Sequence, residues 1–168
     1  MRPKRVDQAD MSGQVEFRSH VSIGQRAALE RLLYFNACQA RVSAGIAAAV
    51  ENFGTPEIVV AGTDRLRVTL SEVPDTQALF AVEKESGRPV GMALYMRQDL
   101  EQVDVLHLSI AAEYASGGVR SDEQLLLKLL RELRRCTRRM KGVRRLELFY
   151  ARTRNSLPRW RPVAKAAV

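Results

Sequence analysis

The stretch that decides the fold reads VDVLHLSI at residues 103–110, AAEYASGGVRS at 111–121, DEQLLLKLLRELRRCTRRMK at 122–141 and RLELFY at 145–150. Residues 103–110 alternate as a strand does, and the leucines between Leu125 and Leu133 recur at the spacing of an amphipathic helix. Gly142 follows that helix as a stop signal, and residues 145–150 have the composition of a second strand. A strand, a helix and a strand in this order predict a parallel crossover.

Two local details follow from the same stretch. Strict alternation divides the first strand into two faces, and we expect the leucine-bearing face to be the core side: Val103, Val105, His107 and Ser109 against Asp104, Leu106, Leu108 and Ile110. Ser121, with Gln124 three residues later, has the sequence of a capping box. We therefore expect the helix to begin directly after Ser121.

The rest of the chain supplies more strands and two early helices. Apolar residues at helical spacing predict one helix from about Ala28 to Val42 and an alanine-rich second helix that ends near Gly54. Strands are predicted at residues 15–21, 58–60, 65–70 and 78–82, and a hairpin turn at 85–88 leads into a strand at 89–96. The prediction is a single α/β domain with a mixed central β-sheet flanked by helices.

Composition bounds the class of protein. A chain of 168 residues is the size of one ordinary domain, and we expect residues 1–13 to form a disordered tail, 14–157 the folded domain and 158–168 a second tail. Cys38 and Cys136 lack partners at disulfide or metal-ligand spacing, and no apolar run is long enough to cross a bilayer. These features favour a cytoplasmic protein with reduced thiols, no metal and no membrane association.

The charge is strongly basic and unevenly distributed. The formal net charge is +8, and residues 120–161 hold 14 Lys plus Arg against four acidic residues. Within the long helix, arginines at i, i+3, i+4, i+7 and i+8 form one stripe, made of Arg131, Arg134, Arg135, Arg138 and Arg139. Such a stripe predicts attraction to polyanions, whether nucleic acid, an acidic protein or a phosphorylated cofactor, and the simplest alternative is a solvated helix face.

Several segments together resemble the GNAT superfamily of N-acetyltransferases. They are FAVE at residues 80–83, GRPVG at 87–91, LHLSIAAEY at 106–114, the pair Gly117–Gly118, and LEL at 146–148 ahead of Asn155. The resemblance covers about residues 78–155 and implies a GNAT-like fold in which the fourth strand splays from the fifth. In that family acyl-coenzyme A lies in the gap between these strands, so the resemblance implies acetyl transfer from acetyl-CoA, or transfer from another acyl-CoA, to an amine.

The same resemblance assigns the residues of a cofactor site. Ser109 and Ile110 would meet the pantetheine arm, and the turn before the helix would hold the diphosphate through Gly117, Gly118, Val119, Arg120 and Ser121. Asn155 resembles the asparagine that follows the fifth strand in the family. The turn departs from the family pattern at Ala115, where a basic residue is usual, and at Arg120, where a small residue is usual.

Two side chains are candidates for proton transfer. His107 is the candidate base, because an ordinary histidine pKa near 6.5 suits proton exchange at neutral pH. Tyr150 is the candidate acid, because it ends the strand after the basic helix and can donate a proton to a thiolate. Each also has a purely structural interpretation, as a hydrogen-bonded strand histidine and a half-buried tyrosine.

The partners are less defined than the cofactor. We expect the acceptor amine to belong to a small molecule or a protein. The predicted sheet is shorter than that of the family it resembles, and an uncovered edge strand favours pairing in a homodimer. The alternative interpretation is a catalytically inactive GNAT-like module that binds nucleic acid or an acidic protein partner through the arginine stripe.

Overall fold

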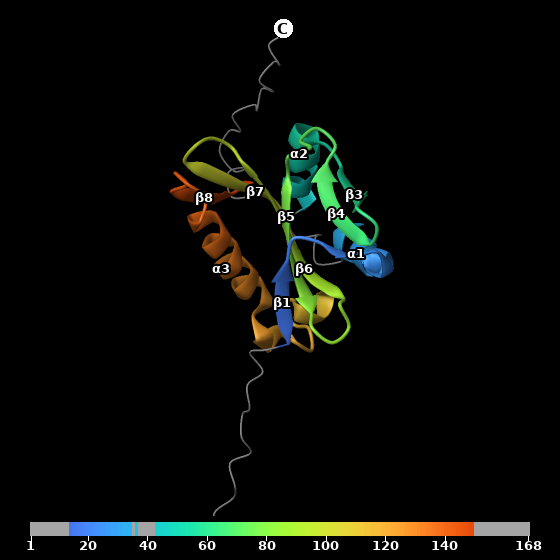
Figure 1. The fold of residues 1–168 in the computed structure, drawn as a ribbon. Helices are drawn as coiled ribbons and strands as arrows, with labels where there is room; N and C mark the ends of the chain where they lie inside the picture. Colours follow the sequence, from blue (N-terminus) through green and yellow to red (C-terminus); the bar gives the residue numbers. More distant parts are fainter. Residues whose placement is uncertain (1–13, 35, 37–42, 150–168) are drawn as a thin grey trace, which may run out of the picture.

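The computed structural model describes residues 14–34, 36 and 43–149 and has a mixed α/β architecture built on a five-stranded sheet (Figure 1). Its strands lie side by side in the order β1 (Val15–Arg18), β5 (Gln77–Glu83), β6 (Pro89–Arg97), β7 (Gln102–Ile110) and β8 (Arg145–Leu148). Neighbouring strands are antiparallel except β7 and β8, which are parallel. Helix α3 (Leu125–Arg138) connects those two strands, so the predicted parallel crossover is confirmed.

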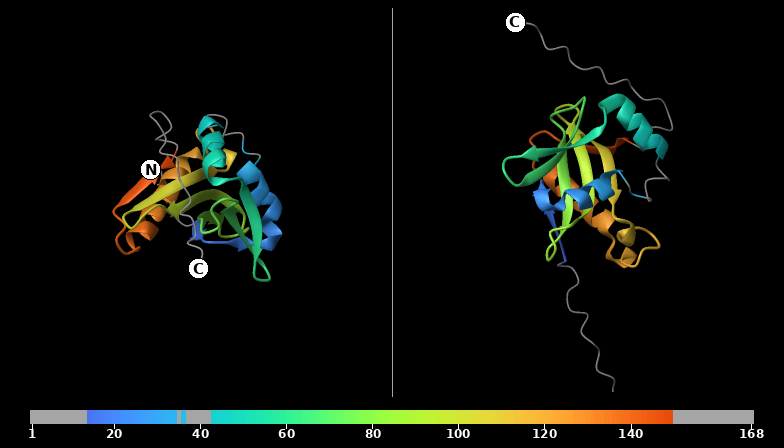
Figure 2. Two further views of the ribbon diagram at one scale, coloured as in Figure 1. Left: turned by 90° about the horizontal axis from the view of Figure 1, so that it is seen from above. Right: turned by 90° about the vertical axis from the view of Figure 1, so that its right-hand side faces the viewer.

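Helices cover both faces of this sheet. Helices α1 (Arg26–Tyr34) and α2 (Ser43–Phe53) lie on one face and α3 lies on the other, as the views in Figure 2 show. Each face has its own apolar cluster. The α1–α2 cluster includes Leu29, Phe53 and Phe80, and the α3 cluster includes Leu125, Leu129 and Leu133.

A smaller sheet extends the α1–α2 side. It has the strand order β2 (Val21–Ser22), β4 (Arg65–Leu70) and β3 (Pro56–Ala61). The expected single strand at residues 15–21 is therefore wrong, because the chain leaves the larger sheet after Arg18 and enters the smaller one at Val21. Phe17 packs against the α3 cluster, whereas Val21 is buried in the α1–α2 cluster on the opposite face. Residues four apart in one regular strand point to the same face, so a single strand could not place these two side chains on opposite faces.

An irregularity in β7 overturns the expected division of its faces. Leu94 lies opposite His107 and Tyr95 opposite Val105, so the register skips Leu106. Because of this β-bulge, Leu106 and His107 both face the α1–α2 side. Leu108 and Ile110 pack against the α3 cluster instead, and both faces of the strand are covered.

The ends of two helices also differ from expectation. Helix α1 ends at Tyr34 and Asn36 lies outside any helix, so the expected unbroken helix from about Ala28 is wrong beyond Tyr34. Helix α3 begins at Leu125, with Gln124 as its N-cap in a left-handed conformation (φ 51°, ψ 42°) and no side-chain cap. Ser121 opens a separate 3₁₀ turn, so the expected capping box is wrong. The α-helix starts where the leucines first reach the core, since Leu125 is only 1% exposed.

Some sequence-based expectations lie outside the described residues. These are the two tails, the domain limit at residue 157, Cys38, Tyr150 and Asn155. Of the helices that the structure describes, none combines the length and apolar character that a membrane crossing needs.

Candidate functional site

The candidate site lies where β7 and β8 separate. Residues Gln102–Val105 of β7 pair with Arg145–Leu148 of β8, and the pairing stops there. Strand β7 continues for five more residues, to Ile110, and over these its other edge is paired with β6. Within the described part of the chain no strand pairs with Leu106–Ile110 on the β8 side, so the two parallel strands share only their first halves.

The turn that follows β7 folds tightly back on itself. Gly117 has φ +87°, a conformation that favours glycine. A Cβ on Gly118 would lie 2.4 Å from the carbonyl oxygen of Glu113 and 2.5 Å from that of Ala112. The Arg120 amide also donates to the Glu113 carbonyl at 2.7 Å. The pair of glycines is therefore required by the turn itself, whatever the turn binds.

A cluster of ionised side chains holds this turn against the sheet. The Arg88 guanidinium lies 2.8 Å from the Glu83 carboxylate and 2.7 Å from that of Glu113. Arg120 lies 3.0 Å from the same Glu83 oxygen, and the Tyr114 hydroxyl donates to that oxygen at 3.1 Å. The hydrogen bond from Arg88 is the main cause that lowers the pKa of Glu83 to about 2, so this carboxylate is ionised at neutral pH. Neither Glu83 nor Arg88 was a predicted site residue, and their role depends on contacts that are distant in sequence.

Arg120 has its side chain committed to this cluster. Besides Glu83 it contacts Glu123 at 2.7 Å and the side chain of Gln14, and its guanidinium lies 4.6 Å from the centroid of the Tyr114 ring. One oxygen of the Glu123 carboxylate, Oε2, is buried without a hydrogen-bond partner among the described residues. The predicted diphosphate ligands on either side of Arg120 are both exposed to solvent: Val119 is 90% exposed, and Ser121 also lies on the surface.

The end of β7 is tied to the segment after α1. The Ser109 hydroxyl donates to the Leu32 carbonyl at 2.8 Å, and the Asn36 amide nitrogen donates to Ser109 Oγ at 3.0 Å and to the Ile110 carbonyl at 2.5 Å. Asn36 therefore already bonds to polar groups of both predicted pantetheine residues. Sequence reasoning missed Asn36, because nothing in its local pattern indicates that it reaches a strand more than seventy residues away.

His107 lies deep in the same region. It is 5% exposed, and burial lowers its pKa from 6.5 to about 4, so the ring is neutral at pH 7. Asp104 lies on the same face of β7 and is 3% exposed, and its carboxylate accepts a hydrogen bond from the Gln102 side chain at 2.7 Å. The bulge at Leu106 brings His107 to this face, and a strict alternation would have separated it from Asp104.

Most of the predicted residues lie on one segment of the chain, the end of β7 and the turn after it, and two lie outside the described residues. His107, Ser109 and Ile110 lie on the part of β7 beyond its pairing with β8, and residues 117–121 lie in the turn that follows. Tyr150 and Asn155 lie outside the described residues. Across residues 14–34, 36 and 43–149, no group of three or more His, Cys, Asp or Glu side chains is placed to hold a metal ion.

A second candidate surface lies on the outer side of α3. The five arginines of the predicted stripe line a groove of about 540 Å³, and we call it the arginine surface: Arg131, Arg134, Arg135, Arg138 and Arg139. Arg135 donates to Glu132 at 2.8 Å. In the part of the chain that the structure describes, the other four arginines form no ion pair, so their charges face the groove.

Comparison with known proteins found no family model that matches the chain and no curated protein that matches it.

Proposed function

We propose that this protein is an acyl-CoA-dependent N-acyltransferase that transfers an acetyl group from acetyl-CoA to an amine. The observation that carries the proposal is the separation of β7 from β8 after Val105. A strand edge without a neighbouring strand offers backbone N–H and C=O groups to an extended ligand. The amide-rich pantetheine arm of coenzyme A is such a ligand, and it would lie along Leu106–Ser109, since the Ile110 carbonyl already accepts a bond from Asn36.

The charged end of the cofactor would rest near the start of α3. The first amides of a helix lack partners within the helix, and they carry a partial positive charge that favours phosphate groups. Asp122 and Glu123 oppose this with two carboxylates, but Arg120 neutralises Glu123 at 2.7 Å. The turn geometry around Gly118 would set how closely the diphosphate approaches these amides.

The chemistry requires two proton transfers. The neutral amine nitrogen forms a bond to the thioester carbon and releases one proton to a base. The carbon–sulfur bond breaks, and the leaving thiolate takes up one proton from an acid. His107 is the proposed base and is neutral at pH 7, as a base must be. Tyr150 is the proposed acid on the strength of its position in the sequence. The acceptor is an amine of a small molecule or a protein.

Calorimetric titration with acetyl-CoA tests the proposal. We expect the wild-type chain to bind, and Gly118→Asp to abolish binding, because the new side chain both collides with two carbonyls and adds a negative charge. The matched control is Gly24→Asp, which adds the same charge at a position where a Cβ would have Ser22 Oγ as its nearest atom, 4.0 Å away. Absence of binding by the wild-type chain at millimolar acetyl-CoA would overturn the assignment.

The arginine surface supports a second candidate function, polyanion binding by a catalytically inactive module. Each phosphate neutralised on a duplex contributes about −0.9 to the slope of log affinity against log salt. We expect salt-dependent binding of a mixed-sequence duplex that is lost in Arg134→Glu/Arg138→Glu. The control variant Arg31→Glu/Lys84→Glu makes the same change of charge on exposed residues away from α3, in α1 and in the turn after β5.

The two experiments separate the candidates. Acetyl-CoA binding that depends on Gly118 supports the transferase. Duplex binding that depends on Arg134 and Arg138, with no cofactor binding, supports the module. If neither ligand binds, both candidates are wrong, and an acidic protein becomes the partner to seek.

A further inference from the structure

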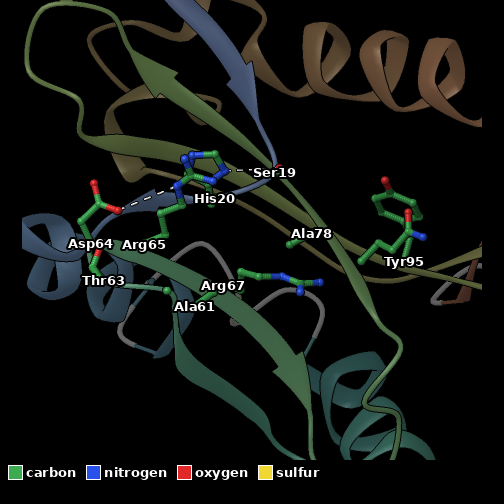
Figure 3. A pocket seen from close by; sticks show the side chains of 11 residues that line it. Ser19, His20, Ala61, Thr63, Asp64, Arg65, Arg67, Ala78 and Tyr95 are labelled. Atoms are coloured by element: carbon green, nitrogen blue, oxygen red, sulfur yellow. Dashed lines mark hydrogen bonds and ion pairs between the residues drawn. The ribbon is translucent and has the colours of Figure 1, made fainter.

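A cavity of about 610 Å³ is lined by residues of both sheets (Figure 3). Most of its polar lining comes from the β1–β2 connection, the β3–β4 turn and β4, through Ser19, His20, Thr63, Asp64, Arg65 and Arg67. Figure 3 shows His20, Arg65 and Asp64 toward one side, Tyr95 toward the other, and Arg67 extending between them. The volume falls in the range of about 300–1,000 Å³ that is usual for small-molecule sites.

The cavity exists because two strands stop short of their neighbours. β1 pairs with Phe80–Glu83 of β5 and leaves Gln77–Leu79 uncovered on that side, among the described residues. Where the structure describes the chain, β2 pairs only with Arg65 and Leu66 of β4. The cavity is lined by Gln77 and Ala78 of β5 and by Arg65 and Arg67 of β4. Backbone groups at such edges are available to hydrogen-bond a ligand.

The charge of the lining is positive. Among the described residues, the lining contains two guanidinium groups, those of Arg65 and Arg67, and one carboxylate, that of Asp64. Asp64 lies 3.8 Å from Arg65, and both side chains are more than half exposed. That distance is too long for a strong hydrogen-bonded pair. Within the described ranges Arg67 forms no ion pair, although it extends across the cavity. His20 adds a ring whose Nδ1 lies 3.4 Å from Ser19 Oγ, and its other nitrogen can serve a ligand.

We propose that this cavity binds a small organic anion through its carboxylate or phosphate oxygens. The Arg67 guanidinium binds the anionic group through two parallel hydrogen bonds, the bidentate geometry that guanidinium groups favour. Arg65 and His20 supply further hydrogen-bond donors. The uncovered edge at Gln77–Leu79 bonds the polar remainder of the molecule. None of the described residues proposed for acyl transfer lines the cavity, so this site is independent of that function.

Amide NMR of the full-length chain tests the site with three probes: succinate, inorganic phosphate and the uncharged succinamide. We expect one of the two anions to cause saturable shifts in the amides of residues 63–67 and 77–79, and the stronger of the two identifies the anionic group. Succinamide should cause none. Absence of saturable shifts with both anions at millimolar concentration, or equal shifts with succinamide, would overturn the proposal.

Three variants sharpen the test. Arg67→Gln should weaken binding about tenfold or more, as expected when a hydrogen bond between charged groups is lost. Asp64→Asn should strengthen binding, because it removes the carboxylate that competes with the anion for Arg65. Arg145→Gln, an exposed arginine on β8, is the matched control and should leave binding unchanged. If Arg145→Gln weakens binding as much as Arg67→Gln, the anion recognises general charge and the site is not specific.

Discussion

Gly118 illustrates how one residue fixes the geometry of the turn. Its φ is not left-handed, so its requirement for glycine comes from space alone: a Cβ would lie 2.4 Å from one backbone oxygen and 2.5 Å from another. The sequence indicates a glycine turn between strand and helix. It does not show which glycine is sterically required, because the obstructing carbonyls of Ala112 and Glu113 belong to a 3₁₀ turn that only the folded chain places there.

Gly118→Ala should therefore lower the free energy of unfolding by about 1–3 kcal/mol, the usual range for overpacking. The backbone must shift, since carbonyl oxygens of the main chain cannot rotate away as a side chain can. Gly24→Ala is the control and should change stability little, because the nearest atom to its Cβ is 4.0 Å away. Urea unfolding of both variants measures the difference. Equal stabilities would mean that the turn can relax to admit the methyl group.

His107 gives a prediction about acid stability. Its pKa is about 4 in the folded chain and 6.5 when unperturbed, so between these values the unfolded chain takes up a proton that the folded chain does not. Stability from this group is therefore full above about pH 6.5 and falls as the pH drops toward 4, by about 3 kcal/mol in all. In His107→Gln this dependence should disappear. Urea unfolding between pH 4 and 7 tests it, and parallel curves for the two proteins would contradict the prediction.

At the scale of elements, the Glu83 cluster joins β5 to the turn before α3. The residues that meet there, Glu83, Arg88, Tyr114 and Arg120, are up to 37 positions apart in the chain. In the sequence Arg120 is predicted to hold a diphosphate, and no local pattern links it to Glu83, Arg88 or Tyr114. Their pairing depends on the sheet order, in which β6 separates β5 from β7, and so it could not be predicted from local patterns.

Glu83→Gln should destabilise the fold by about 2 kcal/mol at pH 7, because Arg88 and Arg120 lose a shared, partly buried carboxylate. The pKa of Glu83 is lowered to about 2, so its contribution is full above the unfolded pKa near 4.5 and is lost as the pH falls toward 2. The stability gap between wild type and variant should therefore narrow in acid. Unfolding midpoints at pH 7, 4 and 2.5 measure it. A gap that stays constant would show that charge is not the cause.

The bulge in β7 marks where element prediction from sequence fails. The strand itself was predicted at residues 103–110, close to its observed bounds Gln102–Ile110. The extra residue at Leu106 carries no glycine or proline signal, yet it moves His107 and Ser109 relative to Val103 and Val105. Because a one-residue slip reverses every later side chain, the candidate site could be located from sequence but its orientation could not.

At the scale of the whole molecule, the larger sheet separates two apolar clusters that were only partly foreseeable. The leucine spacing of α3 predicted only part of its buried face: Leu125, Leu129 and Leu133 are at most 1% exposed, whereas Leu126 is 38% exposed. The smaller sheet was not predicted as a separate sheet. Strands were predicted where β3 and β4 lie, but β2 was merged with β1 in one predicted strand, because which sheet a strand joins is decided by long-range pairing.

The smaller sheet shares its core with the larger one, and this predicts cooperative unfolding. Leu66 of β4 is fully buried in the cluster that also holds Phe80 of β5, whereas Leu129 of α3 is fully buried in the cluster on the opposite face. Leu66→Ala and Leu129→Ala should each lower the free energy of unfolding by about 2–5 kcal/mol. Both should move the midpoint of one common transition, because β5, β6 and β7 contribute side chains to both clusters.

Far-ultraviolet circular dichroism and native-state hydrogen exchange distinguish this from independent unfolding. In a cooperative domain, both Leu66→Ala and Leu129→Ala accelerate hydrogen exchange of the slowest amides in β6. The acceleration in each variant matches the loss in its free energy of unfolding. If the smaller sheet unfolds by itself, Leu66→Ala instead affects amides of β3 and β4 alone and leaves those of β6 unchanged. That outcome would also mean that the anion cavity can be lost while the candidate cofactor site stays folded. The cavity is lined in part by the smaller sheet, and the candidate cofactor site lies on the larger sheet.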